Sequence, residues 1–208
     1  GAELYKMVKE YSNSPGAAGT KNTTTYFKLT NDIYLNDVWA KDLENPTIEV
    51  WNTKFNSWHT VANYNSGFCG DLDGDGFTVY GLYSNTTYAG LVPVLLDGGS
   101  IHNINLKNSF VRGTEAAGGL VGFVKGHWTM SPVSITYCTF DNVVVTSTKK
   151  YVGGVAGGYA DTKITLNNCY VVNSKLSSTN ENKELVSGFI GTGWGNIVHN
   201  ISNCFTDD

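Results

Sequence analysis

Three aspartates at alternate positions are the residues of this chain whose spacing most suggests metal chemistry. The stretch GDLDGDG, residues 70–76, places Asp71, Asp73 and Asp75 two residues apart and ends on a glycine. An EF-hand calcium loop takes oxygen ligands from positions 1, 3 and 5 and closes on a bidentate glutamate at position 12. Counted from Asp71, position 12 is Leu82, and no helical pattern flanks the stretch. A tight turn is therefore expected, and a calcium site of another kind is the alternative.

The four cysteines are the second set of reactive side chains. In a secreted chain they would suggest two disulfides. Cys138, Cys169 and Cys204, however, occupy the equivalent place in a repeated pattern, where the first repeat has Ile104. Free cysteine behaves as a small buried hydrophobe, and stacked side chains with parallel vectors are awkward to bridge. We therefore expect free thiols, with Cys69 also buried, and no spacing indicates a zinc site.

The remaining ionisable residues do not form a catalytic pattern. Glycoside hydrolysis needs two carboxylates at a fixed separation in a cleft, whereas the acidic residues lie mostly in expected loops. A lyase for acidic sugars would need a basic groove, but Arg112 is the one arginine and the net charge is −4. The four histidines are dispersed. We assign no catalytic residue, and the acidic balance argues against a nucleic-acid partner.

A repeat is the element that must position all of these residues. Four glycine-rich segments, beginning at Gly90, Gly119, Gly154 and Gly188, recur every 30 to 35 residues or so. Each is followed by a strand pattern of period two. Aligned, these patterns give columns of like residues: Ile101, Ile135, Leu166 and Ile201; Ile104, Cys138, Cys169 and Cys204; Leu106, Phe140, Val171 and Thr206; Asn108, Asn142 and Asn173.

Short strands at a fixed long repeat predict an all-β parallel β-helix, or β-solenoid, in which like residues stack about 4.8 Å apart. Alternation would also fit a β-sandwich, but a sandwich does not require the same residue type at the same place in each repeat. The asparagine column is expected to stack inward at a bend, each amide bonding the next.

The whole chain reads as one domain, without a linker that would separate a second one. No apolar run reaches the roughly 18 residues of a membrane span, so membrane insertion is not expected. We expect a helix at residues 3–11 that caps the first open coil. The predicted parts of the single domain 1–208 are an N-terminal cap at 1–24, first coils at 25–88 with an aromatic insert at 38–66, and repeat coils at 89–208.

The glycine-rich segments and the strands after them resemble the GLUG-repeat proteins of bacterial surfaces. The resemblance also covers the upstream runs 26–36 and 68–82, and it spans about residues 25 to 206. Pro93, in place of the second glycine of the first repeat, and the insert at 38–66 depart from the pattern. The resemblance implies a right-handed parallel β-helix in a secreted or wall-attached, adhesin-like bacterial protein. It supplies no catalytic residue set and no cofactor.

Aromatic side chains are the candidate ligand-binding residues, because exposed rings stack on sugars and anchor protein partners. Trp128, Tyr159 and Trp194 follow the glycine-rich segments of three successive repeats and could form a row at one corner. Trp51 and Trp58 belong to the aromatic insert. In each case the alternative is local packing, as a lid over a glycine-rich corner or as a satellite hydrophobic cluster.

Two functions follow from these patterns. The first is a non-catalytic binding or adhesion module, a monomeric part of a larger secreted or cell-surface bacterial protein, whose partner is a host glycoprotein, an immunoglobulin or a polysaccharide. The alternative is a carbohydrate-active enzyme, either a polysaccharide lyase or a glycoside hydrolase, or a fragment of one. An enzyme should show a deep groove lined by two carboxylates, and a binding module should show an aromatic surface instead.

Overall fold

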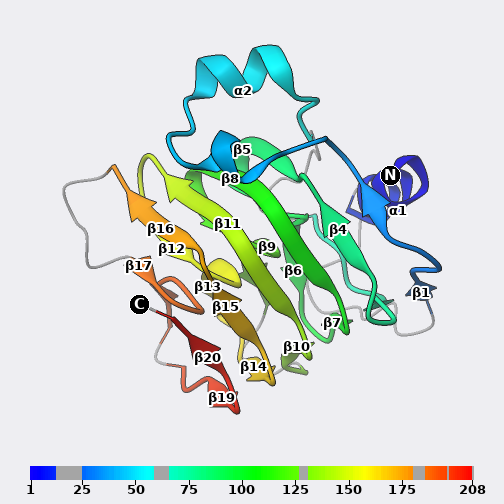
Figure 1. Ribbon diagram of the computed structural model, residues 1–208. Helices are drawn as coiled ribbons and strands as arrows, with labels where there is room; N and C mark the ends of the chain where they lie inside the picture. Colours follow the sequence, from blue (N-terminus) through cyan, green and yellow to red (C-terminus); the bar gives the residue numbers. More distant parts are fainter. Residues whose placement is uncertain (13–24, 59–65, 127–130, 180–185, 196, 208) are drawn as a thin grey trace.

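The protein is built mainly from parallel β-strands, with two short α-helices near the N-terminus (Figure 1). The computed structural model describes residues 1–12, 25–58, 66–126, 131–179, 186–195 and 197–207. Every strand pair formed by these residues is parallel. The prediction of an all-β fold with parallel sheets is therefore confirmed.

The strands form three open sheets, which we call A, B and C. Sheet A contains, in spatial order, β1 (Tyr26–Lys28), β3 (Asp71–Asp73), β7 (Ser100–His102), β10 (Val133–Thr136), β14 (Ile164–Asn167) and β19 (Asn200–Ser202). Sheet C contains β18 (Gly193–Trp194), β13 (Ala156–Ala160), β9 (Val121–Lys125) and β6 (Val92–Leu96).

Sheet B is the largest, with ten strands. Its central path is β17 (Val186–Ser187), β12 (Tyr151–Gly153), β8 (Asn105–Gly118), β11 (Thr139–Ser147), β15 (Tyr170–Val172) and β20 (Phe205–Thr206). Off this path, β4 (Thr78–Tyr80) and β5 (Tyr83–Ala89) both pair with β8, β2 (Ile33–Tyr34) pairs with β4, and β16 (Lys175–Ser178) pairs with β11.

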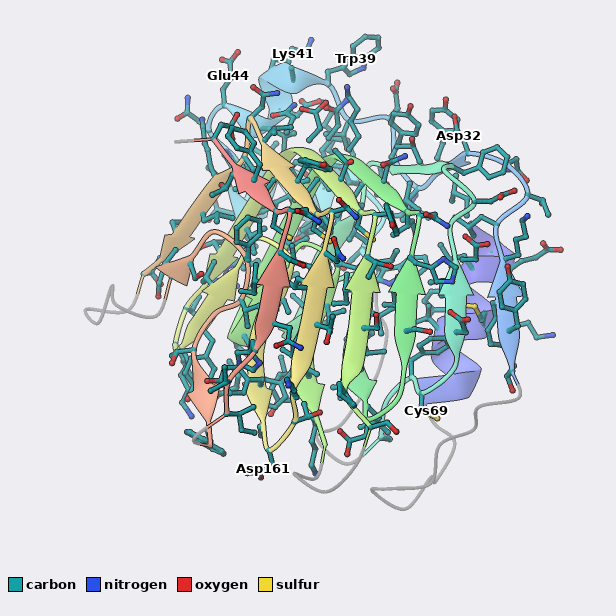
Figure 2. All side chains as sticks on the ribbon, turned by 90° about the horizontal axis from the view of Figure 1, so that it is seen from below. Asp32, Trp39, Lys41, Glu44, Cys69 and Asp161 are labelled. Carbon is teal, nitrogen blue, oxygen red and sulfur yellow. The ribbon has the colours of Figure 1, made fainter. Side chains whose placement is uncertain are left out.

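The chain visits the three sheets in a fixed order. It runs through β7 in sheet A, β8 in sheet B and β9 in sheet C, then returns to sheet A at β10 and repeats the sequence. Figure 2 shows the strands of sheet A side by side and pointing the same way. Each visit to a sheet therefore lays a strand beside the one from the previous repeat.

The columns read from the sequence are the register of these sheets. In sheet A, Ile101 lies opposite Ile135, which lies opposite Leu166. In sheet B, Phe140 lies between Leu106 and Val171. These side chains are almost fully buried and belong to one core enclosed by the sheets. Period-two alternation explains the pattern, because inward residues of every repeat meet the same residues of the next.

The asparagine column marks a bend, as predicted, but its side chains do not stack inward. Asn108, Asn142 and Asn173 have φ values of 50°, 55° and 52°, a left-handed conformation that asparagine tolerates better than most residues. Asn142 Nδ2 donates to Asn108 Oδ1 at 2.9 Å, whereas Asn173 Nδ2 donates to Asp141 Oδ1. None of the three side chains is buried, so this column turns the backbone without filling the core.

The predicted N-terminal helix is present as α1 (Ala2–Ser12) and packs at one end of the stack beside β1 (Figure 1). Leu4 and Val8 lie four residues apart, on one face of the helix, and both are buried in the main core with Leu29 and Ile33. The helix therefore covers the end of the first repeat, where the inward side chains would otherwise meet water.

The insert folds back over the outer face of sheet B. It contains a 3₁₀ turn, η1 (Ala40–Leu43), and α2 (Ile48–Lys54), whose N-cap Thr47 accepts a hydrogen bond from the Val50 N–H. A second, smaller core forms between the insert and the sheet, composed of Val38, Leu43, Trp51, Phe55, Tyr83, Phe110 and Val144. This core fixes the insert against one end of the face.

Candidate functional site

The aspartate stretch is a strand followed by a turn. β3 buries Leu72 completely and directs Asp71 and Asp73 to the outer face of sheet A. The chain then turns through Asp75 at φ 50° and Gly76 at φ 82° before β4 begins. The expected tight turn with Leu72 in the core is therefore confirmed.

The structure adds partners that sequence reasoning missed. In the register of sheet A, Asp71 lies opposite Ser100 and Asp73 lies opposite His102. His102 Nε2 is 3.0 Å from Asp71 Oδ1, and its Nδ1 is 3.4 Å from Asp73 Oδ1. Ser100 Oγ donates to Asp71 Oδ1 at 2.6 Å. The imidazole thus bridges the two carboxylates.

Asp73 is the most strongly held carboxylate of this group. Its partial burial raises the pKa, but three hydrogen bonds outweigh that effect, and with the nearby imidazole they lower the pKa to about 2. The donors are the Asp75 backbone N–H, the Tyr26 hydroxyl at 2.7 Å and Asn103 Nδ2 at 3.1 Å. Charge-assisted hydrogen bonds of this kind stabilise the ionised form.

The group is therefore a satisfied polar network on an open face. Lys28 pairs with Asp75 at 2.9 Å, so the third aspartate is also engaged. Within the described part of the chain, no group of three or more metal-ligating side chains has the geometry of an ion site. Asp71, Asp73 and Asp75 are each held by protein partners.

The aromatic row expected at the glycine-rich corner does not form between Tyr159 and Trp194. Tyr159 lies opposite Gly193, and Trp194 lies opposite Ala160, so the two rings occupy neighbouring columns that point to opposite faces. Tyr159 packs on the main core and meets His199 edge-to-face at 4.2 Å. Trp194 is 56% exposed, with Lys150 Nζ 5.6 Å from its ring centroid. Trp128 lies outside the described residues.

The two insert tryptophans predicted as ligand-binding residues, Trp51 and Trp58, are buried. Trp51 is fully enclosed and contacts Phe55, Tyr83 and Phe110, so it is the centre of the second core rather than a surface ring. Trp58 is almost fully buried, and its Nε1–H donates to the Leu91 carbonyl oxygen at 3.0 Å. For Trp51 the structure shows the alternative stated for the insert, which is packing in a satellite hydrophobic cluster.

An aromatic pair that sequence reasoning missed lies on the outer face of sheet B. Tyr34 of β2 is opposite Tyr80 of β4 in register. Their rings are stacked with centroids 4.7 Å apart and an interplanar angle of 4°. Tyr34 is 71% exposed although Tyr80 covers one face of its ring, so the opposite face of the ring is the open one. The sequence contained the pattern that predicts this pair. Aligning Ile33 with Val79 and Leu106 extends a core column into the first repeats, and it places Tyr34 beside Tyr80.

Three cavities of about 250, 300 and 280 Å³ lie at the two ends of the stack. The first separates α1 from β1, and Glu3 is the one carboxylate among its described lining residues. The second lies between α1, β2 and the end of the insert, beside Tyr34 and Trp58. The third lies beside Tyr159 and His199. Burial lowers the pKa of His199, which favours the neutral imidazole there. None of the three is lined by two described carboxylates.

Cys138, Cys169 and Cys204 form the predicted column. All four are free thiols. Cys138 and Cys169 are fully buried in the main core, and Cys204 packs partly against it. Burial raises the pKa of the Cys138 thiol well above its ordinary value. These thiols are therefore packing residues, and Cys69 is only half-buried, in contrast to the prediction.

Among the described residues, no helix is long and apolar enough to cross a membrane. Comparison of the chain with family models, with curated proteins and with solved structures gave no match.

Proposed function

We propose that the chain is a non-catalytic binding module of a secreted or cell-surface bacterial protein of the GLUG-repeat kind. Its partner would be a host glycoprotein, an immunoglobulin or a polysaccharide. One observation carries the proposal: two stacked tyrosines, Tyr34 and Tyr80, stand on the outer face of a parallel sheet without a packing role in the core. Aromatic rings held on a stiff scaffold are typical of recognition surfaces.

The finer architecture proposed is a right-handed parallel β-helix. Its support is the cyclic order of visits to sheets A, B and C, together with the parallel pairing in all three. Crossover connections between parallel strands are right-handed in nearly all proteins, because the twist of the strands favours that hand. A stack of this kind presents long regular faces on which a partner can dock.

The alternative, a carbohydrate-active enzyme, has weaker support. Asp71 and Asp73 are the carboxylates that come closest to a catalytic pair, since they share one face and one histidine. Both are held by protein donors, Asp73 has its pKa lowered to about 2, and neither lines one of the three cavities. A general acid needs a raised pKa and a substrate cleft beside it.

The test is a combined array of glycans and host proteins, immunoglobulins included, probed with the purified chain and followed by product analysis. We expect at least one class of ligand to bind and to remain chemically unchanged. Cleavage or elimination of any bound glycan would contradict a non-catalytic module and support the alternative of a carbohydrate-active enzyme. Absence of binding to every component would remove the proposed function.

A further inference from the structure

We propose that the cavity of about 300 Å³ between α1, β2 and the end of the insert is a subsite for one neutral pyranose ring of a glycan. This inference rests on the proposed function, since it names the ligand of that binding surface. The cavity is lined by side chains of Tyr5, Tyr34, Leu35, Asn56, Ser57 and Trp58, and its wall is completed by Gly1 and Ala2. Its volume is at the lower end of the range for small-ligand sites, which suits a single ring.

The walls of the cavity match the two kinds of surface that a pyranose presents. A sugar ring has an apolar face of C–H groups, and the open face of the Tyr34 ring is available to stack on it. Trp58 forms a second aromatic wall, with Tyr5 packed edge-to-face on it at a centroid distance of 5.2 Å. Apolar walls with a few polar groups are the usual composition of a small-ligand site.

Polar groups at this cavity come from Asn56 and Ser57. The Asn56 side chain is exposed at the rim, and its amide offers both donors and an acceptor. Ser57 Oγ is buried and has no hydrogen-bond partner among the described residues. An unsatisfied buried hydroxyl is destabilising, and a ligand hydroxyl that reached it would supply the missing partner. The six side chains named above carry no charge, and the α-ammonium of Gly1 at the wall is a further hydrogen-bond donor for sugar hydroxyls.

The cavity is held open by bonds that do not involve its ligand-facing groups. Asn36 Nδ2 donates to the carbonyl oxygens of Asn56 and Gly81, and the Asn56 N–H donates to Asn36 Oδ1 at 2.8 Å. Trp58 is fixed on both its backbone and its ring, through the Tyr83 and Leu91 carbonyl oxygens. A site fixed in this way before binding loses little conformational entropy when the ligand arrives.

The experiment measures binding of the methyl glycosides of glucose, galactose, mannose and N-acetylglucosamine by saturation-transfer NMR and calorimetry, with sialic acid as the acidic comparison. At least one neutral glycoside should bind, and binding of sialic acid alone would overturn the assignment to a neutral ring. Tyr34→Ala should weaken binding and raise the dissociation constant about five- to tenfold, as the loss of one ring stack predicts. Tyr34→Phe keeps the ring and should stay within about twofold of the native chain.

The matched control is Tyr170→Ala, which removes an exposed tyrosine from the outer face of the same sheet at the far side of the stack. It should leave the dissociation constant unchanged, and circular dichroism should show all variants folded. Equal binding by the native chain and Tyr34→Ala would overturn the pyranose subsite. If the arrays identify a protein or an acidic glycan whose binding is unchanged by Tyr34→Ala, the pyranose subsite is wrong and the proposal of a binding module is retained. If nothing binds in either experiment, both the subsite and the binding module are wrong.

Discussion

The middle repeats and the N-terminal region of this molecule are built on the same columns but use their aromatic residues differently. In residues 100–178 the strands stay in register from one repeat to the next, and the large ring of Phe140 fills the core. In residues 25–58 the strands β1 and β2 are three and two residues long, and α1 and the insert pack beside them. Irregular elements packed on a regular stack leave recesses between them.

The positions of the cavities follow this difference. Two of the three lie against α1 and the first strands, and the third lies at the other end beside Tyr159. The regular repeats fill their interior, because each inward residue meets a similar one in the next repeat. The three cavities described above therefore lie at the ends of the stack, where the regular repeat is interrupted. Substitutions in the two regions should therefore have different consequences.

The largest effect is expected in the middle repeats, from Phe140→Ala. Phe140 is fully buried between Leu106 and Val171, and removal of its ring leaves a cavity that the sheets cannot close. The free energy of unfolding should fall by about 3–5 kcal/mol, measured by urea unfolding. Phe205→Ala is the control, because Phe205 is 55% exposed on the outer face of sheet B, and it should change stability by less than about 0.5 kcal/mol. Similar losses in both variants would contradict the stacked core.

A more local effect is expected from Trp51→Ala. Trp51 is the centre of the second core, which joins the insert to sheet B through Tyr83 and Phe110. Its removal should destabilise the insert by about 3 kcal/mol, which corresponds to roughly hundredfold faster amide exchange in α2. Exchange in β14 should change much less, since Ile164 and Leu166 of that strand pack in the main core, which is a separate cluster.

The control for the insert is Trp39→Ala, which removes a ring that projects from the edge of the molecule in Figure 2. It should leave exchange in α2 unchanged. Equal acceleration in α2 and β14 after Trp51→Ala would show that the insert and the repeats unfold as one unit, and the contrast between the two regions would disappear.

The repeat columns were predictable from the sequence, because each column is a direct consequence of register. Ile101, Ile135 and Leu166 lie opposite one another as their alignment requires. The same reasoning, extended one repeat earlier, would have paired Leu72 with Ile101 and thereby brought His102 beside Asp73. The partners of the aspartates were thus available in the pattern and were missed because the earlier strands are short.

The positions of the tryptophan side chains, buried or exposed, were not predictable in the same way. A shift of one residue moves a side chain to the other face of a strand, so Tyr159 and Trp194 follow equivalent segments without sharing a face. The insert has no repeat to supply its register. Whether Trp51 meets water or Tyr83 depends on how the insert folds over sheet B, which is a tertiary contact that neither composition nor periodicity specifies.

A smaller effect is expected from Asn36→Ala, at the junction between the insert and the first repeats. The Asn36 side chain makes hydrogen bonds with Asn56 and with Gly81, and its loss leaves those backbone groups without protein partners. We expect a loss of about 2 kcal/mol in unfolding free energy, together with weaker binding at the adjoining cavity. Asn31→Ala, which removes bonds only to neighbouring residues, is the control and should be close to neutral. An Asn36→Ala chain as stable as the control would show that these bonds do not hold the insert.

The smallest effect concerns the polar network of sheet A and depends on pH. Asp73 has a pKa of about 2 in the folded chain against an ordinary value of 3.8, so the folded state favours its ionised form. The resulting stabilisation is present above pH 4 and is lost as the pH falls through about 2. The full shift corresponds to about 2 kcal/mol, and water at the open face reduces this to about 1 kcal/mol. Thermal unfolding between pH 5 and 2 should therefore show a steeper loss of stability for the native chain than for Asp73→Asn, which cannot ionise. Parallel curves for the two proteins would mean that the bonds from Tyr26 and Asn103 do not select the ionised carboxylate, and that this face is no more ordered than an ordinary surface.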